Sequence, residues 1–214
     1  MALLNEKDRQ YLEEQFGKLT QPVSLVLFTQ EFECASCRDA HELLEETAGL
    51  SDKLTLTIYD LVKDEAKAKA YGVDRVPAVV VEGKSDLGIR FLGIPSGYEY
   101  SSLVEDILAV GSGSSGLSAE TSAALSKLEK PVHIQVFVTP SCPYCPKAVH
   151  TAHMMAMVSP KVTADMVMAN EFPDLANRFG VMAVPKVVLN EKTNFEGAIP
   201  EEDFRSFVVQ AASA

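Results

Sequence analysis

The sequence contains few cysteines, no long apolar run and few basic residues. Only 4 of its 214 residues are cysteine, too few to staple a chain of this length as disulfides staple small secreted domains. No apolar run approaches membrane-spanning length, and the start, MALLNEKDRQYLEEQF, has no basic segment followed by an apolar core. We therefore expect a cytoplasmic protein that does not act at a membrane.

Basic residues are outnumbered by acidic ones. The chain has 19 Lys and Arg against 30 Asp and Glu, a formal net charge of -11. Binding to a phosphate backbone needs clustered Lys and Arg, so we expect no nucleic-acid partner. With 47% hydrophobic and 23% charged residues, the composition is that of a globular protein, and the length allows two small domains.

All four cysteines belong to two CxxC pairs that are 108 residues apart. The flanking segments repeat as well: QPVSLVLFTQEFECASC matches KPVHIQVFVTPSCPYC, and YGVDRVPAVVV matches FGVMAVPKVVL at the same offset. One register held over three motifs indicates two copies of one domain. The predicted domains cover residues 1–110 and 118–214, and residues 111–117, which include GSGSSG, form a flexible linker.

Each copy has the periodicity of an α/β unit. The predicted order is helix, strand, helix, strand, helix, strand, strand, helix, with a mixed sheet. Asn5 and Ser118 are the expected N-caps of the first helix in each copy. The principal strands are expected over residues 24–29, 54–60, 78–81, 133–139, 162–167 and 186–189. In both copies the cysteines fall at the first strand-to-helix junction.

The CxxC spacing at this junction suits redox chemistry. A cysteine attacks a disulfide only as a thiolate, and the pKa of a free thiol is about 8.5. Helix N-termini favour the thiolate through unpaired N–H donors and the helix dipole, which makes Cys34 and Cys142 the expected nucleophiles. Cys37 and Cys145 lie on the same turn, where they can attack the mixed disulfide. Pro143 suits a first helical turn because its missing N–H costs little there.

Metal binding is the alternative use of these cysteines. Cys34, Cys37 and His41 can be drawn as three zinc ligands. The second copy has its histidine, His150, at a different spacing from the cysteines, so we expect no metal. A module that holds an iron–sulfur cluster with glutathione remains open as a function of another class.

These motifs resemble those of the thioredoxin and glutaredoxin superfamily. CPYC after an apolar strand is the glutaredoxin form, and a Val-Pro pair follows some forty residues later. Two such units, with TPSCPYCPKAV and FGVMAVPKVVLN in the second, resemble the protein disulfide oxidoreductases of bacteria and archaea. The resemblance implies two tandem thioredoxin-like α/β folds, each a central mixed sheet flanked by helices with an extra N-terminal helix. It also implies an enzyme that reduces, forms or isomerises protein disulfides.

The resemblance assigns further residues and partners. In the superfamily the proline matching Pro77 and Pro185 is cis and exposes the preceding backbone to an extended substrate, although either proline could simply begin a strand. The expected substrate-binding residues are Val76, Pro77, Pro143, Tyr144, Val184 and Pro185. No cofactor is implied besides the two disulfides. The implied partners are disulfide-containing proteins, a thioredoxin-reductase-like flavoprotein as electron donor, and a peroxiredoxin.

An electron relay is the alternative function within the same class. The N-terminal module of the alkyl hydroperoxide reductase flavoprotein is also a tandem pair of these folds, but only one of its units keeps the cysteines. The two intact CxxC pairs of this chain favour a free-standing oxidoreductase.

One feature of thioredoxins is missing. They carry a buried carboxylate on the strand before CxxC that helps the resolving thiol lose its proton, whereas SLVLFT and HIQVFV contain no acid. Asp165, inside the apolar stretch VTADMVM, is the candidate proton-transfer group. The alternative is that Asp165 is a sheet-edge residue facing solvent.

The two sites also differ in local charge. Glu31 and Glu33 precede Cys34, and like charge disfavours a thiolate, whereas residues 132–163 contain no acid. We therefore predict that Cys142 has the lower thiol pKa and that the second site has the more oxidising potential.

Overall fold

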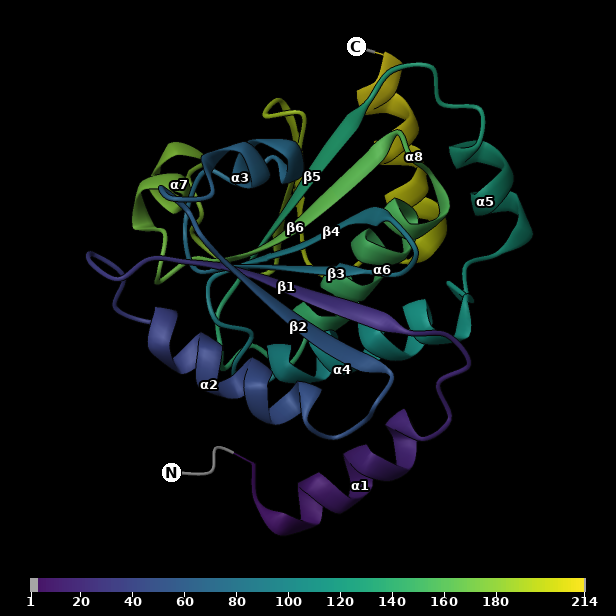
Figure 1. Cartoon of the computed structure of the whole chain (residues 1–214). Coiled ribbons are helices and arrows are strands. Elements are labelled where there is room, and N and C mark those ends of the chain that lie inside the picture. Colours follow the sequence, from purple (N-terminus) through teal and green to yellow (C-terminus); the bar gives the residue numbers. More distant parts are fainter. Residues whose placement is uncertain (1–3, 214) are drawn as a thin grey trace.

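The computed structural model describes residues 4–213 and shows two similar units arranged along one sheet (Figure 1). The first unit contains α1 (Glu6–Phe16), β1 (Val23–Thr29), α2 (Cys37–Ala48), β2 (Leu54–Asp60), α3 (Glu65–Tyr71), β3 (Ala78–Glu82), β4 (Asp86–Leu92) and α4 (Glu99–Ser112). The second contains α5 (Ala119–Leu125), β5 (Val132–Val138), α6 (Cys145–Val158), β6 (Val162–Met168), α7 (Pro173–Arg178), β7 (Lys186–Leu189), β8 (Thr193–Glu196) and α8 (Glu201–Ser213). The predicted order is confirmed in both units. The outermost residues of the predicted domains, 1–3 and 214, lie outside the described residues.

Both predicted helix caps are confirmed. Asn5 Oδ1 accepts the N–H of Asp8 at 3.0 Å, and Ser118 Oγ accepts the N–H of Thr121 at 3.1 Å. Each bond satisfies a donor that the first helical turn leaves unpaired. The principal strands begin and end within one residue of the predicted positions.

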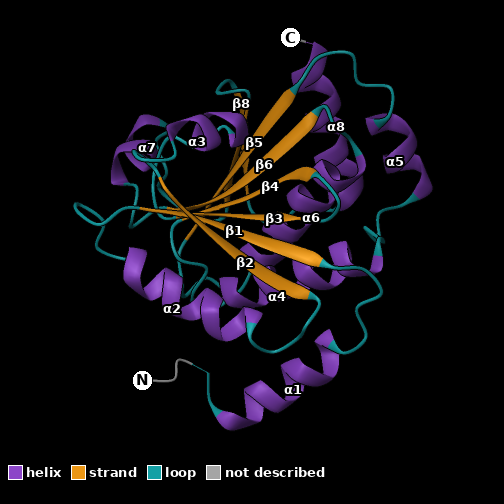
Figure 2. Cartoon of the chain, viewed as in Figure 1, coloured by secondary structure: helices purple, strands orange, loops and turns teal. Residues whose placement is uncertain are grey.

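The two units share one sheet of eight strands in the order β2-β1-β3-β4-β6-β5-β7-β8 (Figure 2). The junction is a parallel pairing of β4 with β6, from Ile89 opposite Ala164 to Leu92 opposite Val167. Each unit thereby covers a sheet edge of the other that would otherwise present unpaired N–H and C=O groups. The repeat predicts two similar units but not this shared sheet.

The expected flexible linker is shorter than predicted. Helix α4 extends through Gly111 to Ser112, two residues into the stretch assigned to the linker. The carbonyl oxygen of Gly111 accepts the N–H groups of Thr20 at 3.0 Å and Gln21 at 2.9 Å. This part of the chain is therefore held against the loop before β1, and the connection to α5 begins at Gly113.

Helices cover both faces of the sheet, with α3 and α7 on one face and α2, α4, α6 and α8 on the other (Figure 1). The larger core lies on the second face and includes Phe16 of α1, Ile107 of α4 and Phe204 of α8. The cysteines of the second site, Cys142 and Cys145, belong to this core. Within residues 4–213, no helix combines the length and apolar character needed to cross a membrane.

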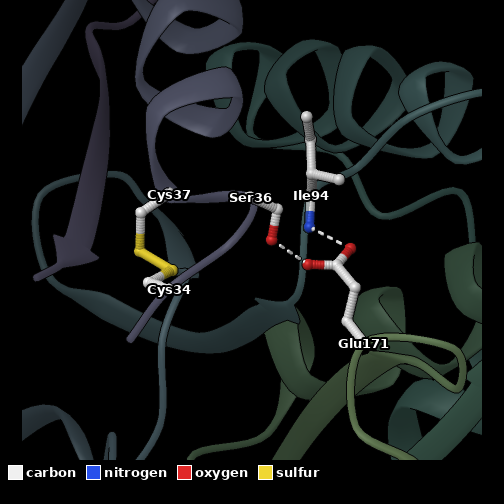
Figure 3. Close-up of a disulfide and its surroundings, with 5 residues drawn as sticks. All are labelled: Cys34, Ser36, Cys37, Ile94 and Glu171. Atoms are coloured by element: carbon white, nitrogen blue, oxygen red, sulfur yellow. Dashed lines mark hydrogen bonds between the residues drawn. A yellow bond between two sulfur atoms is a disulfide. The ribbon is translucent and has the colours of Figure 1, made fainter. Parts of the chain in front are cut away.

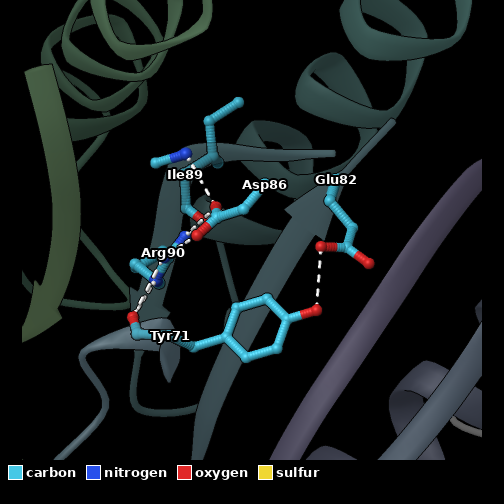
Figure 4. Close-up of polar contacts among 6 residues, drawn as sticks. Tyr71, Glu82, Asp86, Ile89 and Arg90 are labelled. Atoms are coloured by element: carbon cyan, nitrogen blue, oxygen red, sulfur yellow. Dashed lines mark hydrogen bonds and ion pairs between the residues drawn. The ribbon is translucent and has the colours of Figure 1, made fainter. Parts of the chain in front are cut away.

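The junction strand β4 carries a buried cation. Arg90 is only 6% exposed, and its guanidinium donates to Asp86 at 2.6 and 2.8 Å and to the carbonyl oxygen of Tyr71 at 3.0 and 3.2 Å (Figure 4). The Tyr71 hydroxyl in turn donates to Glu82 at 3.0 Å. An unpaired charge at this depth would be costly, so the network explains how Arg90 is accommodated inside the sheet.

Candidate redox sites

Each CxxC pair forms a disulfide directly in front of a helix. The Cα atoms are 5.5 Å apart in both the Cys34–Cys37 and the Cys142–Cys145 pair, a normal span for this bond. Helices α2 and α6 begin at the second cysteine of each pair. The first cysteine therefore precedes the helix and is bonded to its first residue, close to the positive end of the dipole.

The second cysteine is the more buried one in both sites. Cys37 is 4% exposed, and Cys34 is half-buried. Cys145 is fully buried, and Cys142 is 8% exposed. A protein substrate can thus reach the first cysteine of each pair more readily than the second.

Both Val-Pro bonds are cis, as the resemblance implies. They join Val76 to Pro77 and Val184 to Pro185, and each proline directly precedes a strand, β3 or β7. At the second site the Sγ atom of Cys142 lies 3.8 Å from the carbonyl oxygen of Val184. The structure therefore brings the backbone of Val184 to the second disulfide.

The predicted place of Pro143 in the first helical turn is wrong. Because α6 begins at Cys145, Pro143 lies in the turn before the helix, and Pro146 is the second helical residue. A proline needs no intrahelical partner at that position, which explains why Pro146 is tolerated. Pro143 and Tyr144 are exposed beside the disulfide, with Tyr144 72% exposed.

Asp165 lies away from both disulfides. It is on β6 in the sheet interior and is 9% exposed, so the sheet-edge alternative is wrong. Its neighbours Ala164 and Met166 pack in the same core as Cys145, and successive side chains of a strand point to opposite faces. Asp165 therefore faces α3 and α7, where its Oδ2 atom is 2.6 Å from Nε2 of His133.

The Asp165 side chain instead lines a polar cavity of about 310 Å³ at the junction of the units. Arg90 and Gln135, on the strands at either side, flank it in register. Burial lowers the pKa of His133, but the hydrogen bond and charge of Asp165 outweigh this effect and raise it above its ordinary value. The proton-transfer role expected of Asp165 has no geometric support.

A carboxylate that sequence reasoning missed is buried at the start of α4. Glu99 is fully buried, and its Oε2 atom accepts the Ser102 hydroxyl at 2.7 Å. Its Oε1 atom has no hydrogen-bond partner among the described residues. Burial raises the pKa of Glu99 to about 7, so this carboxyl group exchanges protons near neutral pH.

Helices α4 and α6 lie side by side and run in the same direction. Before their first turns, the N–H of Tyr98 donates to the carbonyl oxygen of Pro140 at 3.0 Å. Two turns further on, Asp106 Oδ2 is 2.6 Å from Nδ1 of His153, and both side chains are fully buried. The buried carboxylate is seven residues before Asp106, and Cys145 is eight before His153. At about 1.5 Å per residue, the two lie at nearly the same level.

The sequence does contain a signal for this cluster. Glu99 and Asp106 are spaced seven apart, on the same helix face as the buried Leu103 and Val110. Acids on the apolar face of a helix indicate a specific buried role. His153 has no such signal, because its partner is far away in the sequence.

The first site receives a carboxylate from the second unit. Glu171, in the turn after β6, accepts the hydroxyl of Ser36 on one oxygen and the N–H of Ile94, at 2.9 Å, on the other (Figure 3). Ser36 stands between the two cysteines of CASC. Each disulfide thus has an acid of the other unit nearby. The second site, whose local sequence contains no acid, therefore has one supplied by Glu99.

Comparisons with known proteins agree with this geometry. The thioredoxin domain model matches residues 26–105 and 132–209, one copy in each unit. A protein disulfide oxidoreductase from Aeropyrum pernix K1 is 35% identical and has a TM-score of 0.93, over 98% of this chain and 94% of that one. The N-terminal domain of alkyl hydroperoxide reductase AhpF from Enterococcus faecalis is 31% identical, with a TM-score of 0.89, over 96% of this chain and 99% of that one.

A curated relative gives the same assignment. The alkyl hydroperoxide reductase AhpF of Pseudomonas putida is 30% identical over 202 residues, which make up 94% of this chain and 36% of that protein. The chain thus spans about a third of the length of this relative. With two CxxC disulfides on two thioredoxin folds, it is a thiol-disulfide oxidoreductase. The chain belongs to the thioredoxin-domain family, as a tandem-domain protein disulfide oxidoreductase.

Proposed function

We propose that the chain exchanges electrons with disulfides of other proteins at both CxxC sites. The observation that carries this proposal is the shared geometry of the two sites. In each, a disulfide is bonded to the first residue of a helix, and its second cysteine is the more buried. That arrangement suits Cys34 and Cys142 as nucleophiles and Cys37 and Cys145 as resolving cysteines.

In the reducing direction the reaction starts from the dithiol. The Cys142 thiolate attacks one sulfur of the substrate disulfide; that bond breaks, a mixed disulfide forms, and the released sulfur takes up a proton. The Cys145 thiolate then attacks the Cys142 sulfur, which restores the Cys142–Cys145 disulfide and releases the second substrate sulfur. Two electrons pass to the substrate, and the reverse sequence oxidises it.

Cys145 needs a proton acceptor because it is fully buried. Glu99 lies at the same level on the adjacent helix, and burial raises its pKa to about 7. A group with a pKa near the working pH both accepts and returns a proton efficiently. We assign to Glu99 the role that the sequence suggested for Asp165.

The substrate segment binds beside the cis prolines. The backbone of Val184 already reaches the second disulfide, and an extended peptide can pair with such a free strand edge. The exposed Tyr144 and Pro143 offer an apolar contact on the other side. Val76 and Pro77 occupy the equivalent positions in the first unit.

Electron relay is the second candidate function. The similarity to alkyl hydroperoxide reductase AhpF favours it. In this role a thioredoxin-reductase-like flavoprotein reduces the chain, and the chain reduces a peroxiredoxin. Both functions use the same four cysteines and differ only in the partner.

Reduction of insulin disulfides by dithiothreitol tests the proposal, with wild type, Cys34→Ser, Cys142→Ser and the double variant compared. We expect wild type to accelerate the reaction and the double variant to leave only the rate of dithiothreitol. If wild type adds nothing, and the purified protein carries iron or zinc, the metal-binding alternative replaces this proposal.

A further inference from the structure

The CASC loop is tied to the second unit through a hydroxyl that does not cap its own helix. Ser36 is the N-cap residue of α2, yet its side chain accepts no hydrogen bond from the first turn. It donates instead to Glu171 (Figure 3). A serine hydroxyl has one hydrogen, so while it is bound to Glu171 it cannot donate to the sulfur of Cys34 or Cys37.

The Glu171 carboxylate is held in place by backbone groups of both units. Its second oxygen accepts the N–H of Ile94 at 2.9 Å, and its own N–H donates to the carbonyl oxygen of Met168 at 3.0 Å. Gly93, with a φ of 94°, lets the first unit approach this closely. A Cβ atom there would lie 2.9 Å from Glu171 Oε1 and 2.5 Å from Met168 Cβ. The carboxylate is thus a built part of the junction.

This acid is not a feature of the repeat. The position 108 residues earlier is Lys63, whose side chain is 74% exposed and lies 3.8 Å from Asp60. Only the second unit supplies a carboxylate from this turn, and it supplies it to the first site.

No cation offsets the charge of Glu171. Within residues 4–213, it forms no ion pair with Lys, Arg or His. Arg38 is the nearest cation in the sequence of the first site, but its side chain is 87% exposed and bonded to Glu42 at 2.9 Å. Negative charge therefore remains beside the CASC loop.

We propose that Glu171 is a positioning residue that keeps the Cys34–Cys37 pair the more reducing of the two sites. It withdraws the Ser36 hydroxyl from the sulfurs and holds negative charge near them, and both effects disfavour a thiolate. A dithiol whose thiolate is less stabilised gives up its electrons more readily. The inference rests on the proposed function of this site in thiol-disulfide exchange.

The test is the equilibrium of the first disulfide with glutathione. Two glutathione thiols give two electrons and two protons to the Cys34–Cys37 disulfide, which yields the dithiol and one glutathione disulfide. Full-length protein with Cys142→Ser and Cys145→Ser isolates the first site, and alkylation with mass spectrometry counts its free thiols. We expect Glu171→Gln to shift the equilibrium threefold or more toward the dithiol, about 14 mV at about 30 mV per tenfold.

Matched variants separate the two effects. Asp174→Asn removes an exposed charge of the same unit that does not contact Ser36, and we expect no shift. Ser36→Ala combined with Glu171→Gln should shift the equilibrium less than Glu171→Gln alone, because no hydroxyl is then freed for the sulfur. If Glu171→Gln does not fold, Glu171→Asp, which is too short to keep the bond to Ser36, must shift the equilibrium in the same direction.

An unchanged equilibrium in a folded Glu171→Gln variant overturns the inference. A shift without insulin reduction supports the inference and removes the proposed substrate class. Full insulin reduction without a shift does the reverse, so the two proposals fail separately.

Discussion

The backbone N–H of Tyr98 donates to the carbonyl oxygen of Pro140 at 3.0 Å, which joins the first unit to the loop in front of the second disulfide. Gly97 makes this approach possible. Its φ is 63°, and a Cβ atom there would lie 2.2 Å from the Pro140 oxygen. The second site is therefore built partly by the first unit.

Gly97→Ala should destabilise the protein by roughly 3 kcal/mol, because it combines backbone strain with a clash against backbone. Gly116 is the matched control: it has a similar φ of 68°, but a Cβ atom there would meet open space. Gly116→Ala should therefore cost only about 1 kcal/mol. Urea unfolding measures both variants. Equal losses would contradict the tight packing at Pro140.

Glu99→Gln should remove a pH dependence of stability. The pKa of Glu99 is about 7 in the folded protein against 4.5 ordinarily, so between these values the folded state binds the extra proton. The free energy of unfolding therefore falls as pH rises through this window. We expect Glu99→Gln to gain on the order of 2–3 kcal/mol relative to wild type between pH 5 and pH 8.

The same two pH values serve for the control of that prediction. Glu105→Gln changes an acid of the same helix that is 53% exposed and should leave the pH dependence as in wild type. Parallel curves for wild type and Glu99→Gln would mean that Glu99 is not the buried acid described above.

Asp165→Asn should leave redox activity nearly unchanged. Asp165 faces the cavity under α3 and α7 and not the cysteines, so insulin reduction should stay within about twofold of wild type. Stability should nevertheless fall, because the pKa of His133 is raised by Asp165. That contribution is present below about pH 6.5 and is lost as pH rises through the folded pKa. A large loss of activity would restore Asp165 to the site.

Cys142 should have the lower thiol pKa of the two nucleophiles. Glu31, Glu33 and Glu171 all place charge near the first site, whereas Glu99 near the second is about half protonated at neutral pH. The pH profile of alkylation rate, measured with only one CxxC pair intact at a time, gives each pKa. Coincident profiles would remove the predicted asymmetry.

Local patterns predict the order of elements, both caps and the places of all four cysteines, because each depends on residues close in sequence. The position of β6 could also have been inferred from its composition. VTADMVM is almost continuously apolar, whereas its repeat partner LTLTIYD alternates, and β6 is central while β2 is an edge strand.

The acids at the two sites could not be assigned in this way. Glu99 reaches the second site and Glu171 the first only because β4 pairs with β6 and α4 packs on α6. These contacts join residues far apart in the chain. The apolar surroundings of Asp165 indicate burial, but the alternation of side chains along β6 turns it to the other face of the sheet.

Trapping of mixed disulfides tests the central claim most directly. Reduced Cys37→Ser and Cys145→Ser variants, each with the other CxxC pair replaced by serine, are mixed with a disulfide-containing protein and analysed by mass spectrometry without reductant. We predict a covalent adduct through Cys34 in the first variant and through Cys142 in the second, and none when those cysteines are serine. Adducts formed instead through Cys37 and Cys145, or no adduct at either site, would contradict the account.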